Sequence, residues 1–594
     1  MRAFFLLFSL GLLVILTGLG LFGAFGRFSY VWVPERADLL NPELLPFDSA
    51  WDLWGEGLTD EQATALPPGQ RGGLVRLDDA LLDRGREVFW GETFGNERYL
   101  SDVVGLLDGP VVTPLALLRA LASLRGGHTT DLQVHVSEGV RVGGLTLPPG
   151  SLVSTGLDVP RGAFLPLGIK LFWDRGHLRV GTTCALCHAS VDGVTGQVVQ
   201  GAPNSDLNLG LLLALAPNSA AFFPHAMLPQ VALPTSPLSI PDPRLVEAAV
   251  DRVLMRWPPG SFDSTPDLHP NPTRIPSLFL RGGHPYGWSG SAAAGPFRGV
   301  SAMINFRHGL DAEPATLTSQ SEELFGIPPH GYLAMLLNGA VNVDATPPDT
   351  TFPAPTHPAP SPVAPNGLLL GLPGEKTWQS VNALAAFVHS LQPPRIELAD
   401  AEAVARGRSA FERHGCSECH QGVTLAGNRV IPAETVGTSP SRAAALAGFG
   451  EHLAAPQLPS FDTAPPLLPG ADIQLLPMPE EAQTDLAWAR DGKGGYKIPA
   501  LTGLAWSAPY LHDGGVAVGS DTDFSYGLPE TLLRGEPADA ANSLRALIDP
   551  LLRRRVIATN QRARLDEIGI TGEGHSYWVP YEDQQDLIAY LLSR

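Results

Sequence analysis

All four cysteines of the chain fall into two identical five-residue patterns. The first frame is Cys-Ala-Leu-Cys-His at residues 184–188, and the second frame is Cys-Ser-Glu-Cys-His at residues 416–420. In such a pattern, the two thiols can bond both vinyl groups of one haem while the adjacent histidine binds its iron. The frames therefore predict two covalently bound c-type haems. The residues that would hold them are Cys184, Cys187 and His188 in the first frame and Cys416, Cys419 and His420 in the second.

Two other kinds of site use paired cysteines. Four thiolates can bind one zinc ion, and a Cys-x-x-Cys pair can act as a thioredoxin-like redox centre. Neither alternative gives a role to the histidine that follows each pair, so covalent haem is the favoured interpretation. No cysteine is left over for a disulfide framework.

The N-terminal segment has the composition of an export signal. After Met1 and Arg2, residues 3–26 form a run of 24 residues without a charged side chain. This run is long enough to span a bilayer as a helix, and it exceeds the about 7–15 apolar residues of a cleaved signal. We expect residues 1–27 to be a signal peptide or, in preference, a retained membrane anchor. Either form places the remaining chain outside the cytoplasm, in the periplasm or at the cell surface.

The charge balance argues against a nucleic-acid partner. The 594 residues include 60 acidic and 40 basic side chains, giving a net charge of −20 that a phosphate backbone would repel. The same surface would suit a cationic protein partner. With 64 glycines and 56 prolines, the chain is expected to contain many turns and long loops.

Prolines also mark the expected domain organisation. A proline-rich stretch predicts an extended loop over residues 344–366. Apolar residues at helical spacing follow from Trp378 to Leu391, and Pro393 would end that helix. We therefore expect a domain boundary shortly after this proline. The predicted domains are an N-terminal haem domain with insertions over residues 28–395 and a C-terminal cytochrome c domain over residues 396–594.

An internal repeat accompanies the frames. Ile-Pro-Ser-Leu at residues 275–278 and Ile-Pro-Ala-Leu at residues 498–501, here called the Ile-Pro segments, are each followed by Pro-Tyr, a ring side chain and glycine. The segments lie 223 residues apart and the frames lie 232 residues apart. Such similar spacings predict one duplicated module. The predicted fold is mainly α, with two cytochrome-c-like haem domains related by this duplication, long loops and few short strands.

These motifs resemble those of the bacterial di-haem cytochrome c peroxidases and their relatives. The relatives include the di-haem enzyme that matures methylamine dehydrogenase and the di-haem rubber oxygenases. The resemblance covers roughly residues 80–594 and rests on the frames, the Ile-Pro segments, Ala-Arg-Gly-Arg-Ser-Ala-Phe at residues 405–411 and Ala-Pro-Tyr-Leu-His-Asp-Gly at residues 508–514. The C-terminal Gly574-His575 is closer to the rubber-oxygenase branch.

The resemblance implies an exported oxidoreductase with two unlike haems. The C-terminal haem would have six ligands and relay electrons, and the N-terminal haem would be open to peroxide or dioxygen. The enzyme would reduce peroxide, or use peroxide or dioxygen on an organic substrate. Its electron donor would be a small cytochrome or a cupredoxin, and calcium would be an optional further metal. The alternative that stays open is a pure electron-transfer cytochrome with six ligands on both irons.

Several further site residues follow from the resemblance. His575 is the favoured sixth ligand of the C-terminal haem, with Tyr526 and Met478 as alternatives. Trp288 matches the tryptophan that lies between the two haems, and His308 stands where the peroxidases have a catalytic glutamate. His308 would either act as acid and base on peroxide or bind the iron and close the site.

Three more residues are assigned to haem propionates or their surroundings. His512 is expected to orient a propionate or a backbone group. Arg281 and Arg307 are candidate propionate partners, because a guanidinium group matches the geometry of a carboxylate. Each arginine taken alone is more typical of a protein surface.

Overall fold

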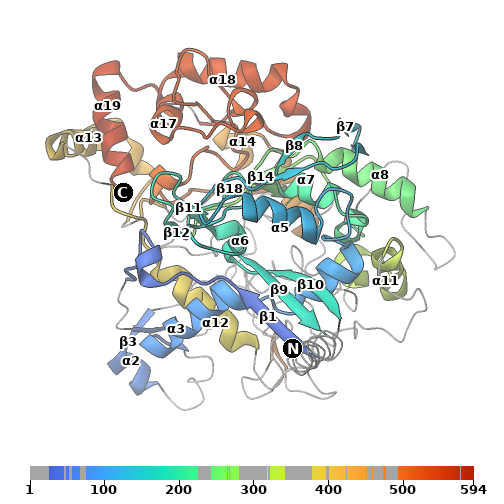
Figure 1. The fold of residues 1–594 in the computed structure, drawn as a ribbon. Coiled ribbons are helices and arrows are strands. Elements are labelled where there is room, and N and C mark those ends of the chain that lie inside the picture. Colours follow the sequence, from blue (N-terminus) through green and yellow to red (C-terminus); the bar gives the residue numbers. More distant parts are fainter. Residues whose placement is uncertain are drawn as a thin grey trace, which may run out of the picture.

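Helices and small antiparallel sheets make up the computed structural model of the protein (Figure 1). It describes residues 26–45, 49–51, 57–66, 75–174, 176–224, 226, 242–263, 265, 268–279, 318, 321–340, 377–396, 400–422, 424–427, 429–450, 457–459, 473–475, 493–575 and 577–594. Several expectations lie outside these residues: the apolar N-terminal run, the proline-rich loop, Arg281, Trp288, Arg307, His308 and Met478.

The described strands form sheets of only two or three strands, all of them antiparallel. The larger sheets have the strand orders β1-β9-β10 and β3-β2-β4. The first contains β1 (Arg27–Val31), β9 (Ile169–Asp174) and β10 (His177–Thr182), and the second contains β3 (Gly57–Thr59), β2 (Ser49–Trp51) and β4 (Val75–Arg76). The two-stranded sheets pair β5 (Gln133–His135) with β8 (Leu152–Ser154), β6 (Val140–Val142) with β7 (Leu145–Leu147), β11 (Ala189–Val191) with β12 (Val198–Gln200), β13 (Ser261–Asp263) with β14 (Pro272–Arg274), β15 (Val430–Pro432) with β18 (Gly495–Lys497), and β16 (Gln457–Pro459) with β17 (Ile473–Leu475).

Helices supply most of the regular structure. The longer ones are α3 (Asp79–Gly91), α5 (Pro114–Ser123), α8 (Pro243–Leu254), α11 (Pro329–Leu337), α12 (Thr377–Ser390), α13 (Ala401–Arg413), α15 (Ser441–Gly450), α17 (Ala540–Ile548), α18 (Pro550–Arg562) and α19 (Tyr581–Leu592). The shorter ones are α2 (Asp60–Ala65), α4 (Asn96–Arg98), α6 (Ala185–His188), α7 (Leu209–Ala214), α10 (Ser321–Phe325) and α14 (Ala433–Val436). The expectation of a mainly α fold is confirmed, whereas the short strands are more numerous than expected, with eighteen among the described residues. Within the described ranges, no helix has the length and apolarity needed to cross a membrane.

Helices α3 and α12 pack closely although they lie far apart in the sequence (Figure 1). The rings of Phe89 and Phe387 meet between them, with centroids 5.4 Å apart. Gly85 permits the close approach, because a Cβ atom at this position would lie 2.0 Å from the carbonyl oxygen of Ala383. A side chain at residue 85 would therefore push the two helices apart.

Helices α13 and α19 form a second pair of the same kind. Phe411 and Tyr590 meet with ring centroids 5.5 Å apart, and a Cβ atom at Gly407 would lie 1.9 Å from the carbonyl oxygen of Asp586. The first helix of each pair contains Arg-Gly-Arg followed three residues later by phenylalanine, at residues 84–89 in α3 and residues 406–411 in α13. The two helix pairs thus share a sequence pattern, an aromatic contact and a glycine at the crossing.

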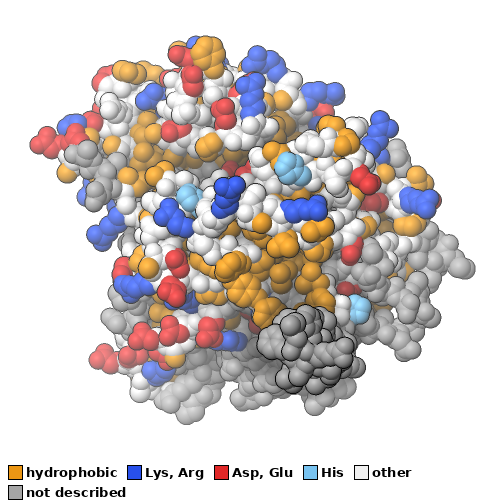
Figure 2. Space-filling model, viewed as in Figure 1, with side chains coloured by type: hydrophobic (Ala, Val, Ile, Leu, Met, Phe, Trp, Pro, Cys, Tyr) orange, Lys and Arg blue, Asp and Glu red, His pale blue; other side chains and the backbone are white. Residues whose placement is uncertain are grey.

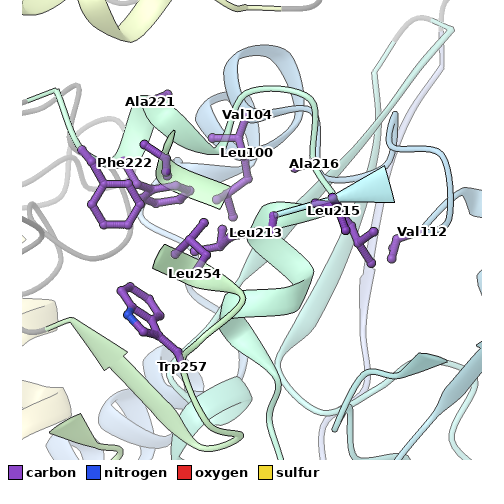
Figure 3. Packing of buried hydrophobic residues seen from close by; sticks show 14 of the residues in the cluster. Leu100, Val104, Val112, Leu213, Leu215, Ala216, Ala221, Phe222, Leu254 and Trp257 are labelled. Atoms are coloured by element: carbon purple, nitrogen blue, oxygen red, sulfur yellow. The ribbon is translucent and has the colours of Figure 1, made fainter. Parts of the chain in front are cut away.

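The largest buried cluster lies in the N-terminal part of the chain, between η3 (Tyr99–Val104), α7, η4 (Ser219–Phe222) and α8. Figure 3 shows Leu100, Leu213, Leu254 and Phe222 gathered around one point, with Trp257 beside them. Phe222 meets Tyr99 edge-on, with ring centroids 5.3 Å apart. Several side chains of this cluster line the large cavity of the candidate site.

Candidate functional site

The first frame forms a single helical turn between β10 and β11. The backbone N–H of His188 donates to the carbonyl oxygen of Cys184 at 3.0 Å. Gly168 packs so close to the turn that a Cβ atom there would lie 2.0 Å from the backbone nitrogen of Leu186. Its φ of +69° is also a left-handed conformation that favours glycine. The loop through Gly168 therefore holds the frame in place.

The ring of His188 is oriented by a backbone carbonyl. Its Nδ1 atom lies 3.0 Å from the carbonyl oxygen of Pro276. Because a carbonyl oxygen can only accept, Nδ1 carries the proton and Nε2 is the ring's acceptor nitrogen. Metal-ligating histidines are oriented in this way by a bond from their other ring nitrogen. Burial lowers the pKa of His188 to about 4, against the effect of the Pro276 carbonyl, so the ring is neutral at pH 7.

The second frame repeats this arrangement. It begins in the short 3-10 turn η8 (Cys416–Glu418). His420 Nδ1 lies 2.8 Å from the carbonyl oxygen of Leu425, and the carbonyl of Pro499 also bonds this histidine. Burial lowers the pKa of His420, and both carbonyls oppose that shift. Each frame histidine is thus bonded by the proline carbonyl of the Ile-Pro segment that follows it in the sequence.

One thiol of each frame, Cys184 and Cys416, has a raised pKa. Burial raises the pKa of Cys184 to about 12, and burial also raises the pKa of Cys416. Zinc binding and thiol redox chemistry both need the thiolate. Within the described residues, which include all four cysteines, no three His, Cys, Asp or Glu side chains are placed to hold one metal ion. A four-thiolate zinc site would need the two frames to come together, and the described residues show no such cluster.

One cavity of about 1330 Å³ is bounded by both frames. All four cysteines and both frame histidines lie on its wall. Most of the other wall residues are apolar, among them Leu100, Leu213, Phe222 and Trp257 of the cluster in Figure 3 and Phe411, Leu504, Leu587 and Leu591 of the C-terminal part. A site for one small molecule has about 300–1,000 Å³, so this cavity is larger than one such ligand requires.

Arg274 is a charged residue in this apolar wall that the motifs did not reveal. It directly precedes the first Ile-Pro segment and is 7% exposed. Its Nη1 donates to the carbonyl oxygen of Pro259 at 2.6 Å, whereas Nη2 is buried with no hydrogen-bond partner among the described residues. Burial lowers the pKa of Arg274 to about 10, and the charge of Asp206 opposes that shift. The guanidinium is therefore charged at pH 7 and has a donor left for an anionic group.

A sequence signal for Arg274 exists in the repeat. Lys497 occupies the equivalent position before the second Ile-Pro segment, and it lines the same cavity. A cation directly before each Ile-Pro segment is therefore a shared feature of both halves. Arg281 and Arg307, the arginines expected to bind propionates, lie outside the described residues.

His512 joins the two halves of the chain through its backbone. Its carbonyl oxygen accepts from the backbone N–H of Arg274 at 2.8 Å and from Thr273 Oγ1 at 2.9 Å. Its ring packs on Tyr496 with centroids 4.5 Å apart, and Nε2 lies 3.3 Å from the tyrosine hydroxyl. Burial lowers the pKa of His512 to about 4, so this ring is also neutral at pH 7. His512 lines the cavity, and its contact with a propionate stays a prediction.

His575 lies on the cavity wall with the second frame. Its ring stands edge-on to Tyr577, with centroids 5.0 Å apart. The pKa of Tyr577 is raised by burial and by the nearby Cys416 and Cys419, so this segment adjoins the second frame. The structure therefore brings His575 to the frame for which it was predicted as a ligand.

A buried aspartate holds the turn that precedes His575. Asp513 is 0% exposed. Its Oδ2 accepts from the backbone N–H of Thr571 at 2.9 Å and of Gly572 at 3.1 Å, and its Oδ1 accepts from Gly515 N–H at 2.8 Å. Arg553 Nε donates to the carbonyl oxygen of Gly572 from the other side. Asp513, in the His-Asp-Gly motif, thus ties the C-terminal turn to the cavity wall.

Tyr526, the alternative ligand, is placed differently. Its hydroxyl donates to the carbonyl oxygen of Thr522 at 2.5 Å and accepts from Arg555 Nη1 at 2.8 Å. It is not one of the residues that line the cavity. Of the two candidate ligands that the structure describes, only His575 therefore faces the space between the frames.

Comparisons with protein-family models, with curated proteins and with solved structures found no match to this chain.

Proposed function

We propose that the chain is an exported di-haem c-type cytochrome with oxidoreductase activity. Cys184 and Cys187 would hold one haem with His188 as its ligand, and the second frame would hold the other through Cys416, Cys419 and His420. One observation carries the proposal: on the wall of one cavity lie all four thiols and both frame histidines, and each histidine donates Nδ1–H to a backbone carbonyl.

The cavity fits the chemistry of the proposed cofactor. A haem is a large apolar macrocycle with two carboxylates, and this space is large, mainly apolar and provided with the buried guanidinium of Arg274. The unpartnered Nη2 would donate to a propionate, which would satisfy both charges in an apolar surrounding. Arg274 would therefore have the role that the sequence suggested for Arg281 and Arg307, whose own roles stay predictions.

A duplicated module accounts for the likeness of the two halves. Each half has an Arg-Gly-Arg helix crossed by a later helix at its glycine, a frame, and an Ile-Pro segment whose proline carbonyl bonds the frame histidine. These elements follow the same order in both halves of the sequence. We infer that the N-terminal half is the copy with insertions, between its first helix and its frame and again after its Ile-Pro segment.

The two proposed haems would have different roles. When bound, a haem supplies an iron that relays electrons or reacts with peroxide or dioxygen, according to its sixth ligand. On the C-terminal side, His575 would be that ligand and the Asp513 network would hold its turn in position. On the N-terminal side, the apolar wall would exclude water, Trp288 would lie between the haems, and His308 would hold or move a proton.

The resulting reaction class is reduction of peroxide, or use of peroxide or dioxygen on an organic substrate. A small cytochrome or cupredoxin would supply the electrons, and the acidic surface of the chain suits a cationic donor. Ligation by a histidine on both irons would instead make the protein a pure electron carrier. Reaction with peroxide separates the two functions.

Haem counting tests the proposal directly. The pyridine haemochrome spectrum of the purified full chain should give two haems per polypeptide, which stay attached in a denaturing gel. A Cys184→Ala, Cys187→Ala double variant should retain one haem, as should the matched Cys416→Ala, Cys419→Ala variant. Zinc in place of iron in elemental analysis would overturn the proposal. A high-spin signal that changes on addition of peroxide would support the enzyme over the carrier.

A further inference from the structure

The sheet β1-β9-β10 has one apolar face. Phe28 on β1 and Leu178 on β10 both pair with Trp173 on β9, so the three side chains lie in one row on the same face. The next row on that face is Tyr30, Leu171 and Val180. The opposite face is mixed: Phe172 lies between Ser29 and Arg179. On this face Arg179 pairs with Asp102 at 2.9 Å, and Lys170 Nζ donates to the carbonyl oxygen of Gly91 at 2.6 Å.

This apolar face runs from the cavity to the surface. Leu171, Leu178 and Val180 all line the cavity. Val180 is 4% exposed, Leu178 is 37% exposed and Phe28, at the edge of the row, is 55% exposed. Among the described residues, the cavity wall therefore continues outward as exposed apolar surface.

Exposed apolar side chains from α5 and from the loop before β9 also line the cavity where it meets the surface. Leu118 on α5 is 63% exposed and Phe164, in the loop before β9, is 78% exposed, and both line the cavity. Leu115, one turn before Leu118, is 54% exposed. In Figure 2 hydrophobic side chains form a continuous area over β1, β9, β10 and α5 of Figure 1, with Lys and Arg side chains along one border. We call Phe28, Leu115, Leu118, Phe164 and Leu178 the apolar mouth.

A contiguous exposed apolar surface marks a binding site for an apolar partner. The sequence indicates which partner this is, because the 24 uncharged residues that can span a bilayer end at Gly26, and β1 begins at Arg27 with Phe28 next to it. The apolar mouth thus starts where the membrane segment ends. Cations that border an apolar surface suit the headgroup region.

We propose that the apolar mouth rests on a lipid bilayer and that the cavity opens into it. Burial of these side chains in the acyl region would stabilise the contact by the hydrophobic effect. Molecules that reach the cavity by this route are lipid-soluble ones, so the organic substrate would be an apolar molecule dissolved in the membrane. This substrate class rests on the proposed function, whereas the membrane contact does not depend on it.

Two exposed phenylalanines provide a matched test. Phe164 lies in the apolar mouth and is 78% exposed, and Phe524 lies in the C-terminal part, away from the cavity wall, and is 77% exposed. Each is replaced by the photoreactive p-benzoylphenylalanine in the full haem-loaded chain, reconstituted in vesicles of phosphatidylcholine and phosphatidylglycerol. After illumination, mass spectrometry should find lipid adducts at residue 164 and none at residue 524. Absence of lipid adducts at residue 164, or a cross-link to a second copy of the chain, would overturn the membrane contact.

A second probe tests the opening. The unsubstituted chain is reconstituted with a phospholipid that has a diazirine in its acyl chain, and the peptide around the wall residue Leu121 is examined for adducts. Labelling of that peptide supports entry from the bilayer, and labelling restricted to the exposed mouth overturns it. Haem content is measured on the same samples, so a chain with fewer than two haems identifies failure of the proposed function and not of the membrane contact.

Discussion

The Nδ1 atom of His188 lies 3.0 Å from the carbonyl oxygen of Pro276, 88 residues further along the chain. A backbone carbonyl is not removed by substitution, so the orientation of this ring depends on where the Ile-Pro segment lies. The Ile-Pro segment is in turn placed by β14, whose Arg274 N–H bonds the carbonyl oxygen of His512. Substitutions that move these supporting elements are therefore the informative ones.

The glycines at the two helix crossings should not tolerate a side chain. Gly85→Ala and Gly407→Ala each place a Cβ atom about 2 Å from a backbone oxygen of the partner helix. Overpacking of this kind lowers the free energy of unfolding by about 1–3 kcal/mol, which urea denaturation measures. Gly91→Ala is the control in α3, because nothing lies within 4 Å of its Cβ position. Equal stability of Gly85→Ala and Gly91→Ala would contradict the packing.

Asp513→Asn should loosen the turn that leads to His575. Asparagine keeps only one acceptor oxygen, because an NH₂ group replaces the other. Either Gly515 N–H or the N–H groups of Thr571 and Gly572 would therefore lose their acceptor. A buried donor left without a partner costs about 1–3 kcal/mol, so the melting temperature should fall. With haem bound, the low-spin signal of the C-terminal haem should weaken. Asp521→Asn, at an exposed aspartate that accepts from Asp523 N–H, should change neither measurement.

Arg274→Gln should lower the reduction potential of the N-terminal haem. Ferrous iron has one positive charge less than ferric iron, so a nearby buried cation favours the reduced state. Removal of that cation therefore lowers the reduction potential. A tenfold change in the equilibrium corresponds to about 59 mV for one electron, and we expect a shift of that order in a spectroelectrochemical titration. Arg161→Gln is the control, since this arginine is exposed and donates to the Thr195 carbonyl. A potential unchanged in Arg274→Gln would show that no propionate is bound there.

Ionisation of the buried Asp251 in α8 should lower the free energy of unfolding as the pH rises. Burial, with a further contribution from Glu247, raises the pKa of Asp251 from 3.8 to about 7. The folded chain therefore binds more protons than the unfolded chain between these values, and stability falls as the pH rises through that window. Asp251→Asn removes this loss, so its stabilising effect should be larger at pH 8 than at pH 4. The exposed Glu138→Gln gives the reference, and a difference of the same size at both pH values would refute the assignment.

The local pattern of the sequence predicted several elements correctly. The helix expected from Trp378 onward is α12, which ends at Ser390, shortly before Pro393. Both frames predict covalent haem because their spacing lets two thiols and an imidazole converge on one macrocycle, and this assignment stays a prediction. His575 was recognised by resemblance, and it does lie on the cavity wall.

Contacts between distant segments were not predictable from local pattern. Phe28 pairs with Trp173, and nothing near either residue specifies the other. The cation before each Ile-Pro segment was visible in the repeat, but the burial of Arg274 was not, because its contacts with Asp206, Pro259 and His512 come from three other segments. The common Arg-Gly-Arg pattern of α3 and α13 was present in the sequence, but its meaning became visible only when both glycines were seen at helix crossings.

In the proposed di-haem protein, burial of the Cys184 thiol favours one order of assembly. In the folded chain its pKa is about 12, whereas an unfolded cysteine has a pKa of about 8.5. The thiol is thus far more reactive before the first frame packs beneath Gly168 than afterwards. Attachment of the cofactor is therefore expected on the nascent, still extended polypeptide, and the core would then close around a group already in place. Chains that fold before they are loaded would be dead-end products of biogenesis.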